Sequence, residues 1–182
     1  DDTDAGTLQR AAWQPVSDRK IRVGIVGCGR ISSNHFESIN VHKEHLQLTA
    51  VCDTNAAALA AAEAKYGVTG YPSLHEFLHS ADVDLVVLCT PSGLHPQQAI
   101  EVAKAGRHVM TEKPMATRWT DGMRMVRECD EAGVRLFVVK QNRRNATLQL
   151  LKRAMEKRRF GRIYMVTINV FWSRPQSYYD SS

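Results

Sequence analysis

The sequence of 182 residues has few cysteines and no long apolar run. No stretch approaches the roughly 20 apolar residues of a membrane-spanning helix, so we expect no membrane anchor. The cysteines are Cys28, Cys52, Cys89 and Cys129. They form no C-x-x-C pair and lie in apolar or helical contexts, which favours reduced core thiols in a cytoplasmic protein. Repeats and low-complexity segments are also lacking, and 43% hydrophobic with 24% charged residues is typical of a globular protein.

The first 20 residues contain acids but lack the apolar core of an export signal. We expect residues 1–20 to form a mobile polar tail in which Trp13 is the only sizeable anchor. The folded part is then expected to begin at residue 21.

Aromatic residues are scarce in the basic segment 140–162, where Phe160 is the only one. Glu156 is the only acid in this segment, which carries much of the net charge of +5. Nucleic-acid sites usually interleave cations with aromatic residues. The spacing in LQLLKRAMEKRRF instead gives a helix with one apolar and one basic face, so we expect a solvated helix and no nucleic-acid partner. The cations from Lys140 to Arg144 follow a strand end and could face an anionic ligand.

Apolar runs alternate with helical patterns from residue 21 onward. We expect strands at 21–26, 46–52, 84–89, 107–111 and 134–139. We expect helices near 30–40, at 55–65, after the capping box Ser73-x-x-Glu76, from about Pro96, and at 117–132 and 146–158. Helix 117–132 is expected to present Trp119, Met123 and Val126 on one face. The alternation predicts an α/β fold with a doubly wound parallel sheet that helices cover on both faces.

The segment GRIYMVTINVFW differs from the rest, because its alternating residues are all apolar. They are Tyr164, Val166, Ile168, Val170 and Trp172. We expect a long strand, for which the remaining residues are too few to form a hairpin partner. The strand would pair either with another molecule or, as we favour, with a continuation of the protein past Ser182. We therefore expect a dinucleotide-binding domain at 21–145 and the connecting helix and first strand of a second domain at 146–182.

The string IRVGIVGCGRIS is an apolar run that ends in Gly27-x-Gly29, and Asp53 closes the next apolar run. Gly27 allows a sharp turn, Gly29 lets backbone N–H groups approach a pyrophosphate, and the next helix points its positive end there. Asp53 is spaced to hold the ribose hydroxyls, which favours NAD over NADP. Ser32 stands at the third fingerprint position, where glycine is usual. The cofactor contacts expected here are Gly27, Cys28, Gly29, Arg30, Ile31 and Asp53.

Polar clusters follow the expected strands at their carboxyl ends. They are Gly27–Gly29, Asp53, Thr90–Pro91, Glu112–Lys113 and Gln141–Asn142. Open parallel sheets bind ligands at this edge, so we expect one crevice. A lysine there can donate to a substrate hydroxyl and stabilise it as it becomes an alkoxide, with Glu112 orienting the ammonium group or contacting the cofactor. The alternative for Lys113 is an ordinary surface Lys-Pro turn.

Two of the histidines allow a rival interpretation, that of a zinc site. His75-Glu76-Phe77-Leu78-His79 matches the H-E-x-x-H motif of zinc hydrolases, with Glu101 as a third ligand. The capping box already uses Glu76, and the motif lies away from the crevice, so we expect no metal. His35, His42, His45 and His108 show no ligand grouping. His95 begins a helix near the crevice and is expected to contact cofactor or substrate.

The order G-x-G-R-I, C-D-x-N, D-x-D-L-V-V-L-C-T-P-S-x-L-H and G-R-H-V-M-T-E-K-P resembles the glucose–fructose oxidoreductase / inositol dehydrogenase family over residues 21–175. The resemblance implies a Rossmann domain followed by an α/β domain with a large, mostly antiparallel sheet. It implies that Lys113 is catalytic and that its bond to Pro114 is cis. Ser92 replaces the usual asparagine of T-P-N. The family's second catalytic group, a histidine of the second domain, has no counterpart here.

VVKQNRRNATLQLLKRA and VFWSRPQSYYD are similar, more narrowly, to the UDP-N-acetylglucosaminuronate 3-dehydrogenases of bacterial O-antigen synthesis. This implies oxidation of the sugar 3-hydroxyl by NAD to a 3-keto sugar, recycling of the cofactor by 2-oxoglutarate, and a homo-oligomer. The further cofactor contacts implied are Thr90, Pro91, Ser92, His95, Glu112, Lys113, Gln141, Trp172 and Arg174. The substrate contacts implied are Lys113, Asn142, Arg143 and Arg174. Lys140, Arg143, Arg144 and Arg174 suit a substrate with a carboxylate and a diphosphate.

Two other functions compete with this one. The chain could belong to a dehydrogenase of the same family that acts on another sugar or on inositol. It could also be a non-catalytic regulator that senses a dinucleotide. Lys113 favours an enzyme, because a sensor has no use for a group that stabilises an alkoxide.

Overall fold

The computed structural model describes residues 16–177, so most of the expected N-terminal tail, with Trp13, lies outside the described residues. The chain divides into two compact units, Asp1–Val139 and Lys140–Ser182. The first unit therefore ends at Val139 rather than at the expected residue 145. The reason is local, because the short turn that follows packs against the next helix and belongs with it.

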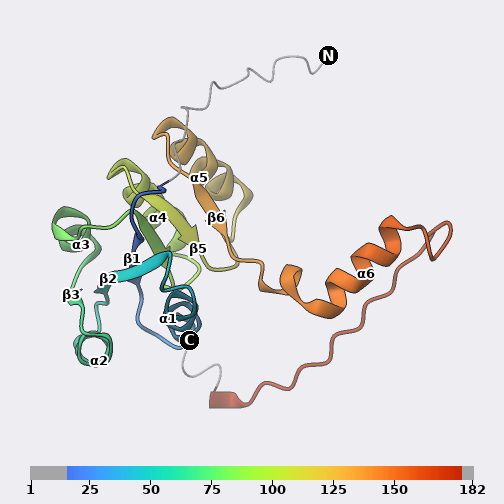
Figure 1. Ribbon diagram of the computed structural model, residues 1–182, viewed down its shortest axis with the longest axis horizontal. Helices are drawn as coiled ribbons and strands as arrows, with labels where there is room; N and C mark the ends of the chain where they lie inside the picture. The colour runs from blue at the N-terminus through green and yellow to red at the C-terminus, as the bar shows by residue number, and fades with distance from the viewer. Residues whose placement is uncertain (1–15, 178–182) are drawn as a thin grey trace. The chain divides into compact units, whose positions relative to one another are not determined.

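The first unit contains a six-stranded parallel sheet (Figure 1). Its strands are β1 (Ile21–Val26), β2 (Leu46–Cys52), β3 (Thr69–Tyr71), β4 (Leu85–Leu88), β5 (His108–Thr111) and β6 (Leu136–Val138). They lie in the order β3-β2-β1-β4-β5-β6. After β1 the chain adds β2 and β3 on one side of β1, and it then crosses back to add β4, β5 and β6 on the other side. This reversal between β1 and β4 is the point where such sheets bind ligands, and it confirms the predicted doubly wound fold.

The edge strand β3 is not among the strands expected from the sequence. Its three residues are too few to show an alternating pattern. The strand forms because β2 offers a free edge, along which Ala50 pairs with Thr69 and Cys52 pairs with Tyr71.

Helices cover both faces of the sheet, as predicted for a parallel sheet. They are α1 (Ser32–Val41), α2 (Ala56–Tyr66), α3 (Leu74–Ser80), α4 (His95–Lys104) and α5 (Trp119–Glu131). Phe36 of α1 and Leu59 of α2 pack on one face with Ile25. Phe77 of α3, Val102 of α4 and Met125 of α5 pack on the other. The two apolar layers hold the strands so that their carboxyl ends form one edge.

The cysteines are free thiols, in agreement with the prediction. Cys52, Cys89 and Cys129 are buried, and Cys28 is partly buried. Burial raises the pKa of Cys28 and Cys129 to about 11 and that of Cys52 to about 12, and it raises the pKa of Cys89 further. Thiols with such raised pKa values are poor nucleophiles, so these side chains serve packing.

The face of α5 that carries Trp119, Met123 and Val126 is the exposed face of the helix. Trp119 is 81% exposed and Met123 is 48% exposed, whereas Gly122, Met125 and Cys129 are buried. Both sets have helical spacing, so periodicity alone could not choose between them. The choice depends on close packing, because a side chain at Gly122 would come within 3.1 Å of Met115 Cε.

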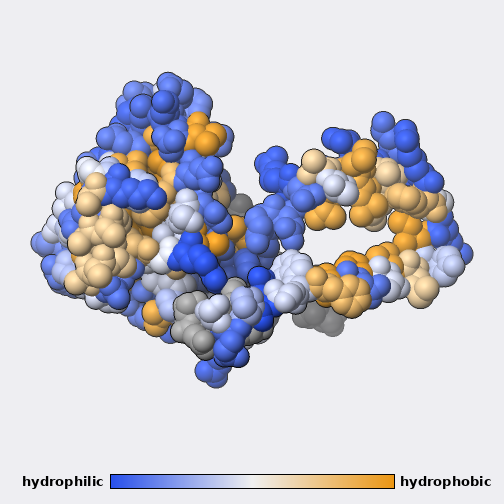
Figure 2. Space-filling model, turned by 90° about the horizontal axis from the view of Figure 1, so that it is seen from below, coloured by the Kyte–Doolittle hydropathy of each residue, from blue (hydrophilic) through white to orange (hydrophobic). Residues whose placement is uncertain are grey.

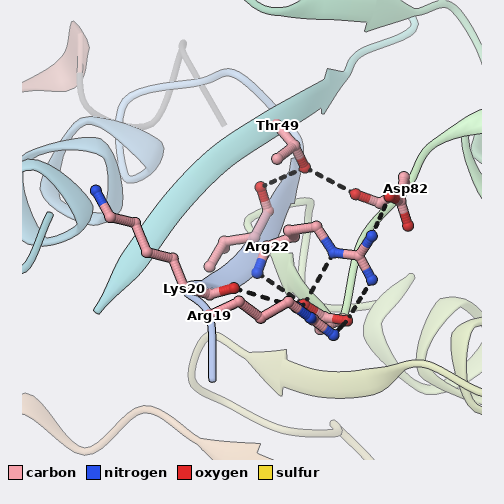
Figure 3. Close-up of polar contacts among 7 residues, drawn as sticks. Arg19, Lys20, Arg22, Thr49 and Asp82 are labelled. Atoms are coloured by element: carbon pink, nitrogen blue, oxygen red, sulfur yellow. Dashed lines mark hydrogen bonds and ion pairs between the residues drawn. The ribbon is translucent and has the colours of Figure 1, made fainter. Parts of the chain in front are cut away.

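A network of ions joins β1 to the start of β4 at the amino ends of the strands, opposite the ligand edge. Asp84 accepts hydrogen bonds from the Arg22 amide at 2.8 Å and from both Arg19 and Arg22 guanidinium groups. Arg22 also pairs with Asp82, whose carbonyl oxygen accepts from Thr49 (Figure 3). Burial opposes ionisation of Asp84, but the hydrogen bonds from the two arginines hold the pKa of this carboxyl well below its usual range.

We expect Asp84→Asn to lower the free energy of unfolding by about 2–3 kcal/mol at neutral pH, because it removes charge-assisted hydrogen bonds from a mostly buried group. A lowered folded-state pKa stabilises the protein above the unfolded-state value of about 3.9, and this stabilisation is lost as the pH falls below it. Urea unfolding at neutral and acid pH should therefore show the difference between wild type and variant shrinking in acid. Asp82→Asn is the control, because Asp82 is 73% exposed and should matter little. If the difference in unfolding free energy between wild type and Asp84→Asn did not change with pH, the lowered pKa of Asp84 would be contradicted.

The second unit contains a short 3₁₀ turn, η1 (Gln141–Arg144), and the helix α6 (Ala146–Glu156). The strand predicted from Ile163 is not formed, because a strand needs a neighbouring strand to pair with, and no strand of the described chain pairs with residues 163–172. Figure 2 shows apolar residues along α6 and the segment after it. The predicted apolar face is exposed throughout, from 63% at Val170 to 90% at Tyr164.

No helix within residues 16–177 is both long enough and apolar enough to cross a bilayer.

Candidate functional site

The structure brings the predicted site residues of the first unit to one edge of the sheet. The glycine turn follows β1, Asp53 follows β2, Thr90 follows β4, and Glu112 follows β5. The turn is anchored to its neighbour, because the Gly27 amide donates to the Cys52 carbonyl at 2.8 Å. These four positions therefore lie at the same edge of the sheet, and their part in a ligand site stays a prediction.

Gly27 and Gly29 have different physical roles in the turn. Gly27 has a φ of 91°, and a Cβ there would lie 2.8 Å from the Cys89 carbonyl carbon and 2.9 Å from the Thr90 nitrogen. The turn thus packs its backbone directly against the loop after β4. Gly29 is exposed, and a Cβ there would meet no atom within 4 Å. Its outer side is open to a ligand.

The amino end of α1 has no side-chain cap. The two serines of its first turn donate backward to the glycine loop, Ser32 Oγ to the Gly29 carbonyl and Ser33 Oγ to the Arg30 carbonyl. Because helix N-termini carry N–H groups without helical partners and a partial positive charge, this end suits an anion such as a pyrophosphate.

Asp53 joins the turn after β1 to the start of α2. Its Oδ2 accepts the Cys28 amide at 2.7 Å, and its Oδ1 accepts the Asn55 amide at 2.8 Å. Asn55 in turn caps α2 by accepting from the Ala58 amide. Each carboxylate oxygen can accept a further hydrogen bond, so the fixed carboxylate can also hold two ribose hydroxyls. No arginine stands in the following residues to neutralise a phosphate.

His95 holds two loops together instead of facing a ligand, contrary to our expectation. Its ring is 1% exposed. Nε2 lies 2.8 Å from the Thr90 carbonyl and Nδ1 lies 2.9 Å from the Pro114 carbonyl. Both partners are backbone carbonyl oxygens of loops at the sheet edge. The carbonyl groups of Thr90 and Pro114 engage both ring nitrogens, so neither remains for cofactor or substrate. His95 is the first residue of α4 and is buried beneath the two loops.

Lys113 lies at the exposed rim of the site, and Glu112 lies beneath it. The Lys113–Pro114 peptide bond is cis, which confirms the expectation from the family resemblance. Glu112 is 7% exposed, and its Oε2 accepts the Lys113 amide at 3.2 Å. Its Oε1 lies 2.8 Å from Nε2 of His35. His35 was not among the site residues predicted from the sequence. Its position on the first turn of α1, at the same sheet edge, was the available signal.

The other residues of the loop after β4 lie at the same edge. Pro91 is exposed and Ser92 is half-buried. The Thr90 hydroxyl donates to Gln98 of α4, so this loop is fixed at both Thr90 and His95. Arg30 is exposed and Ile31 half-buried beside the glycine turn.

The predicted contacts of the second unit stay predictions, because each unit is described by itself. Gln141, Asn142 and Arg143 lie in η1, which Gln149 of α6 holds by bonding to the Arg143 carbonyl. The Arg174 guanidinium lies 4.9 Å from the centre of the Trp172 ring. These two residues therefore act as one cation–π pair.

The zinc alternative is not supported. His75 and His79 stack with ring centres 6.5 Å apart, but Glu76 completes the capping box, in which Ser73 Oγ donates to its carboxylate at 3.0 Å. Glu101 lies on α4 and accepts from Gln97. Within residues 16–177, no three possible ligands gather to hold a metal.

Of the cavities that border α1, two are lined by Ser33 and Phe36. One of about 200 Å³ borders the glycine turn and is lined by Cys28, Gly29 and Ser32 together with alanines of α2. A larger one of about 850 Å³ lies toward the amino end of β2, beside Leu46 and Leu48. It contains none of the predicted site residues.

Comparisons with known proteins agree with this geometry. The chain is 66% identical to the WlbA dehydrogenase of Bordetella pertussis, crystallised with NADH and UDP-GlcNAcA, with a TM-score of 0.88 over 90% of this chain and 50% of that chain. It is 61% identical to the WlbA dehydrogenase of Chromobacterium violaceum, crystallised with the same ligands, with a TM-score of 0.89 over 92% and 49%. Myo-inositol 2-dehydrogenase of Thermotoga maritima is 32% identical over 81% of this chain and 44% of the relative. The chain thus spans about half the length of these relatives.

Residues 21–140 match the family described as an oxidoreductase family with an NAD-binding Rossmann fold. This range covers the whole sheet, the glycine turn, Asp53 and Lys113. The chain belongs to this family, that of glucose–fructose oxidoreductase and the inositol dehydrogenases.

Proposed function

We propose that this chain forms the cofactor-binding part of an NAD-dependent enzyme that oxidises the 3-hydroxyl of a UDP-N-acetyl-2-amino-2-deoxyglucuronate-type sugar nucleotide to a 3-keto group. One observation carries the proposal. The chain is 61–66% identical, over nine-tenths of its length, to WlbA dehydrogenases crystallised with NADH and UDP-GlcNAcA. The inositol dehydrogenases are far more distant, at 32% identity or less among the curated relatives of that name.

The residues of the site fit NAD. The open side of Gly29 and the uncapped end of α1 would receive the pyrophosphate, and Asp53 would hold the ribose. When bound, the nicotinamide accepts the hydrogen nucleus and electron pair that leave the sugar carbon. Thr90 and Lys113, which follow β4 and β5, would lie beside that ring, with buried Glu112 beneath Lys113.

Lys113 would act on the substrate oxygen. Its ammonium group donates a hydrogen bond to the 3-hydroxyl and stabilises the negative charge that grows as the hydroxyl proton leaves to a base. The C–H electron pair goes to the cofactor and the C–O bond gains its second pair, so the products are the ketone, reduced cofactor and one proton. Buried Glu112 fixes the backbone of Lys113 while the side chain remains exposed to substrate.

The proposal includes features that depend on the second unit and on the assembled protein. Asn142, Arg143 and Arg174 would bind the carboxylate and diphosphate of the substrate, with Gln141 and the Trp172–Arg174 pair near the cofactor. We also propose recycling of the cofactor by 2-oxoglutarate, a homo-oligomer, and a synthetic role in O-antigen sugars. The four free thiols favour a cytoplasmic location, where thiols stay reduced.

The test is NADH formation, followed by its near-ultraviolet absorbance, with UDP-GlcNAcA, UDP-GlcNAc and myo-inositol as alternative substrates for the active enzyme that contains this chain. We expect turnover with UDP-GlcNAcA and at least a tenfold lower kcat/KM for UDP-GlcNAc, because the carboxylate partners are then left unpaired. Preferred turnover of inositol would support the broader dehydrogenase alternative. NADH binding without turnover of any substrate would support the sensor.

We expect NAD to bind at least tenfold more tightly than NADP. The 2′-phosphate of NADP would lie near the Asp53 carboxylate, and like charges about 4 Å apart cost about 4 kcal/mol at a partly screened site. Titration of the chain with both cofactors measures the ratio. Asp53→Asn should reduce it, since the amide keeps an acceptor for the Cys28 amide but removes the charge. Equal or tighter binding of NADP by the wild type would overturn the assignment.

A further inference from the structure

We propose that His35 is a positioning residue for Lys113, acting through the carboxylate of Glu112. The inference rests on the proposed function, because it assigns His35 a part in placing the lysine that acts on the substrate. His35 lies on α1, the helix whose amino end would receive the pyrophosphate, whereas Lys113 follows β5.

Glu112 is an unusual side chain in this fold. Within residues 16–177, it is the only acidic residue that is buried. A buried carboxylate is costly unless its oxygens are hydrogen-bonded. Here both oxygens have partners, since Oε1 lies 2.8 Å from His35 Nε2 and Oε2 lies 3.2 Å from the Lys113 amide. The site thus retains a polar side chain that an apolar one could have replaced for packing alone.

The two contacts fix the carboxylate as a rigid link. One oxygen points to α1 and the other to the backbone of Lys113, so a rotation of the Glu112 side chain that frees one contact also disturbs the other. The His35 side chain is 13% exposed and that of Glu112 is 9% exposed, so little water can compete. His35 therefore determines how Glu112 presents its second oxygen to Lys113.

The location of His35 gives the link a functional meaning. His35 lies on the first turn of α1, directly after the glycine turn that would receive the pyrophosphate. The relay His35–Glu112–Lys113 connects that end of the cofactor site to the reacting end. A displacement of the lysine by a fraction of an ångström weakens its bond to the substrate oxygen at the transition state more than it weakens cofactor binding.

The kinetic test compares His35→Ala, Glu112→Ala and the double variant, with His42→Ala as the matched control from the exposed end of α1. We expect His35→Ala to lower kcat about tenfold with the Kd for NAD changed less than about threefold. Because His35 acts through Glu112, the double variant should be no slower than Glu112→Ala. His42→Ala should match the wild type. His35→Gln, which keeps a donor, should recover part of the loss.

A second measurement is independent of turnover and of the proposed function. In the isotope-labelled chain, the NMR signal of the Lys113 amide should shift in His35→Ala and remain in place in His42→Ala. If the wild type fails to oxidise the sugar nucleotide, the proposed function fails, and the amide signal alone decides whether His35 positions Lys113.

Three results would overturn the inference. The first is a Lys113 amide signal that does not move in His35→Ala. The second is a double variant whose loss in kcat is the product of the two single losses, which would mean that the residues act separately. The third is a loss in kcat that matches the loss of folded protein in thermal melts, which would make His35 merely structural.

Discussion

Replacing Lys113 with alanine should lower kcat by about 10²–10³-fold and leave the Kd for NAD nearly unchanged. A single preorganised donor to a developing oxyanion contributes about this much to catalysis. The Lys113 side chain is exposed at the rim, while its backbone is held by Glu112, so removal of the ammonium group should leave the loop in place. The effect therefore belongs to the transition state and not to cofactor binding.

Steady-state kinetics and a separate cofactor titration measure the two quantities for Lys113→Ala. Lys104→Ala is the control, because Lys104 is an exposed lysine on α4 whose contact is a 3.5 Å ion pair with Glu128. It should retain full turnover. Near-normal turnover by Lys113→Ala would remove this lysine from the mechanism and revive the dinucleotide-sensing alternative.

Gly27→Ala should destabilise the first unit by about 3 kcal/mol or more and abolish NAD binding. The φ of 91° is strained for any residue with a side chain. The added Cβ would also lie under 3 Å from backbone atoms of Cys89 and Thr90, which cannot rotate away as a side chain would. Relief requires separating the glycine turn from the loop after β4, and both loops form the cofactor site.

Gly29→Ala provides the matched control in the same turn. A Cβ at Gly29 meets nothing within 4 Å, so the variant should fold with a thermal midpoint close to that of the wild type. It should still bind NAD at least about tenfold more weakly, because the methyl group would occupy the space through which the pyrophosphate reaches the backbone. Wild-type stability and NAD affinity in Gly27→Ala would contradict this account of the turn.

Local sequence was sufficient where the physical cause was local. The bounds of β1 and β2 follow from apolar runs that stop at a glycine turn and at Asp53. Asn55 and Ser73 each cap the helix that follows by accepting a backbone N–H within three residues. The placement of Asp53 and Lys113 at one edge follows from the rule that parallel strands end on the same side. The cis bond before Pro114 came from the family resemblance and not from the residues themselves.

Tertiary structure decided the features that depend on which distant groups meet. The buried face of α5, the pairing of β3 and the burial of His95 were not predictable from spacing, because each needs a neighbour far away in the sequence. For the strand predicted after Ile163, the sequence pattern was clear but the neighbour was lacking. Its residues alternate as in a strand, but no strand within the described residues pairs with them. His35 and Glu112 lie 77 positions apart in the sequence. Their contact exists only because the sheet order β1-β4-β5 and the packing of α1 bring a helix start and a strand end together.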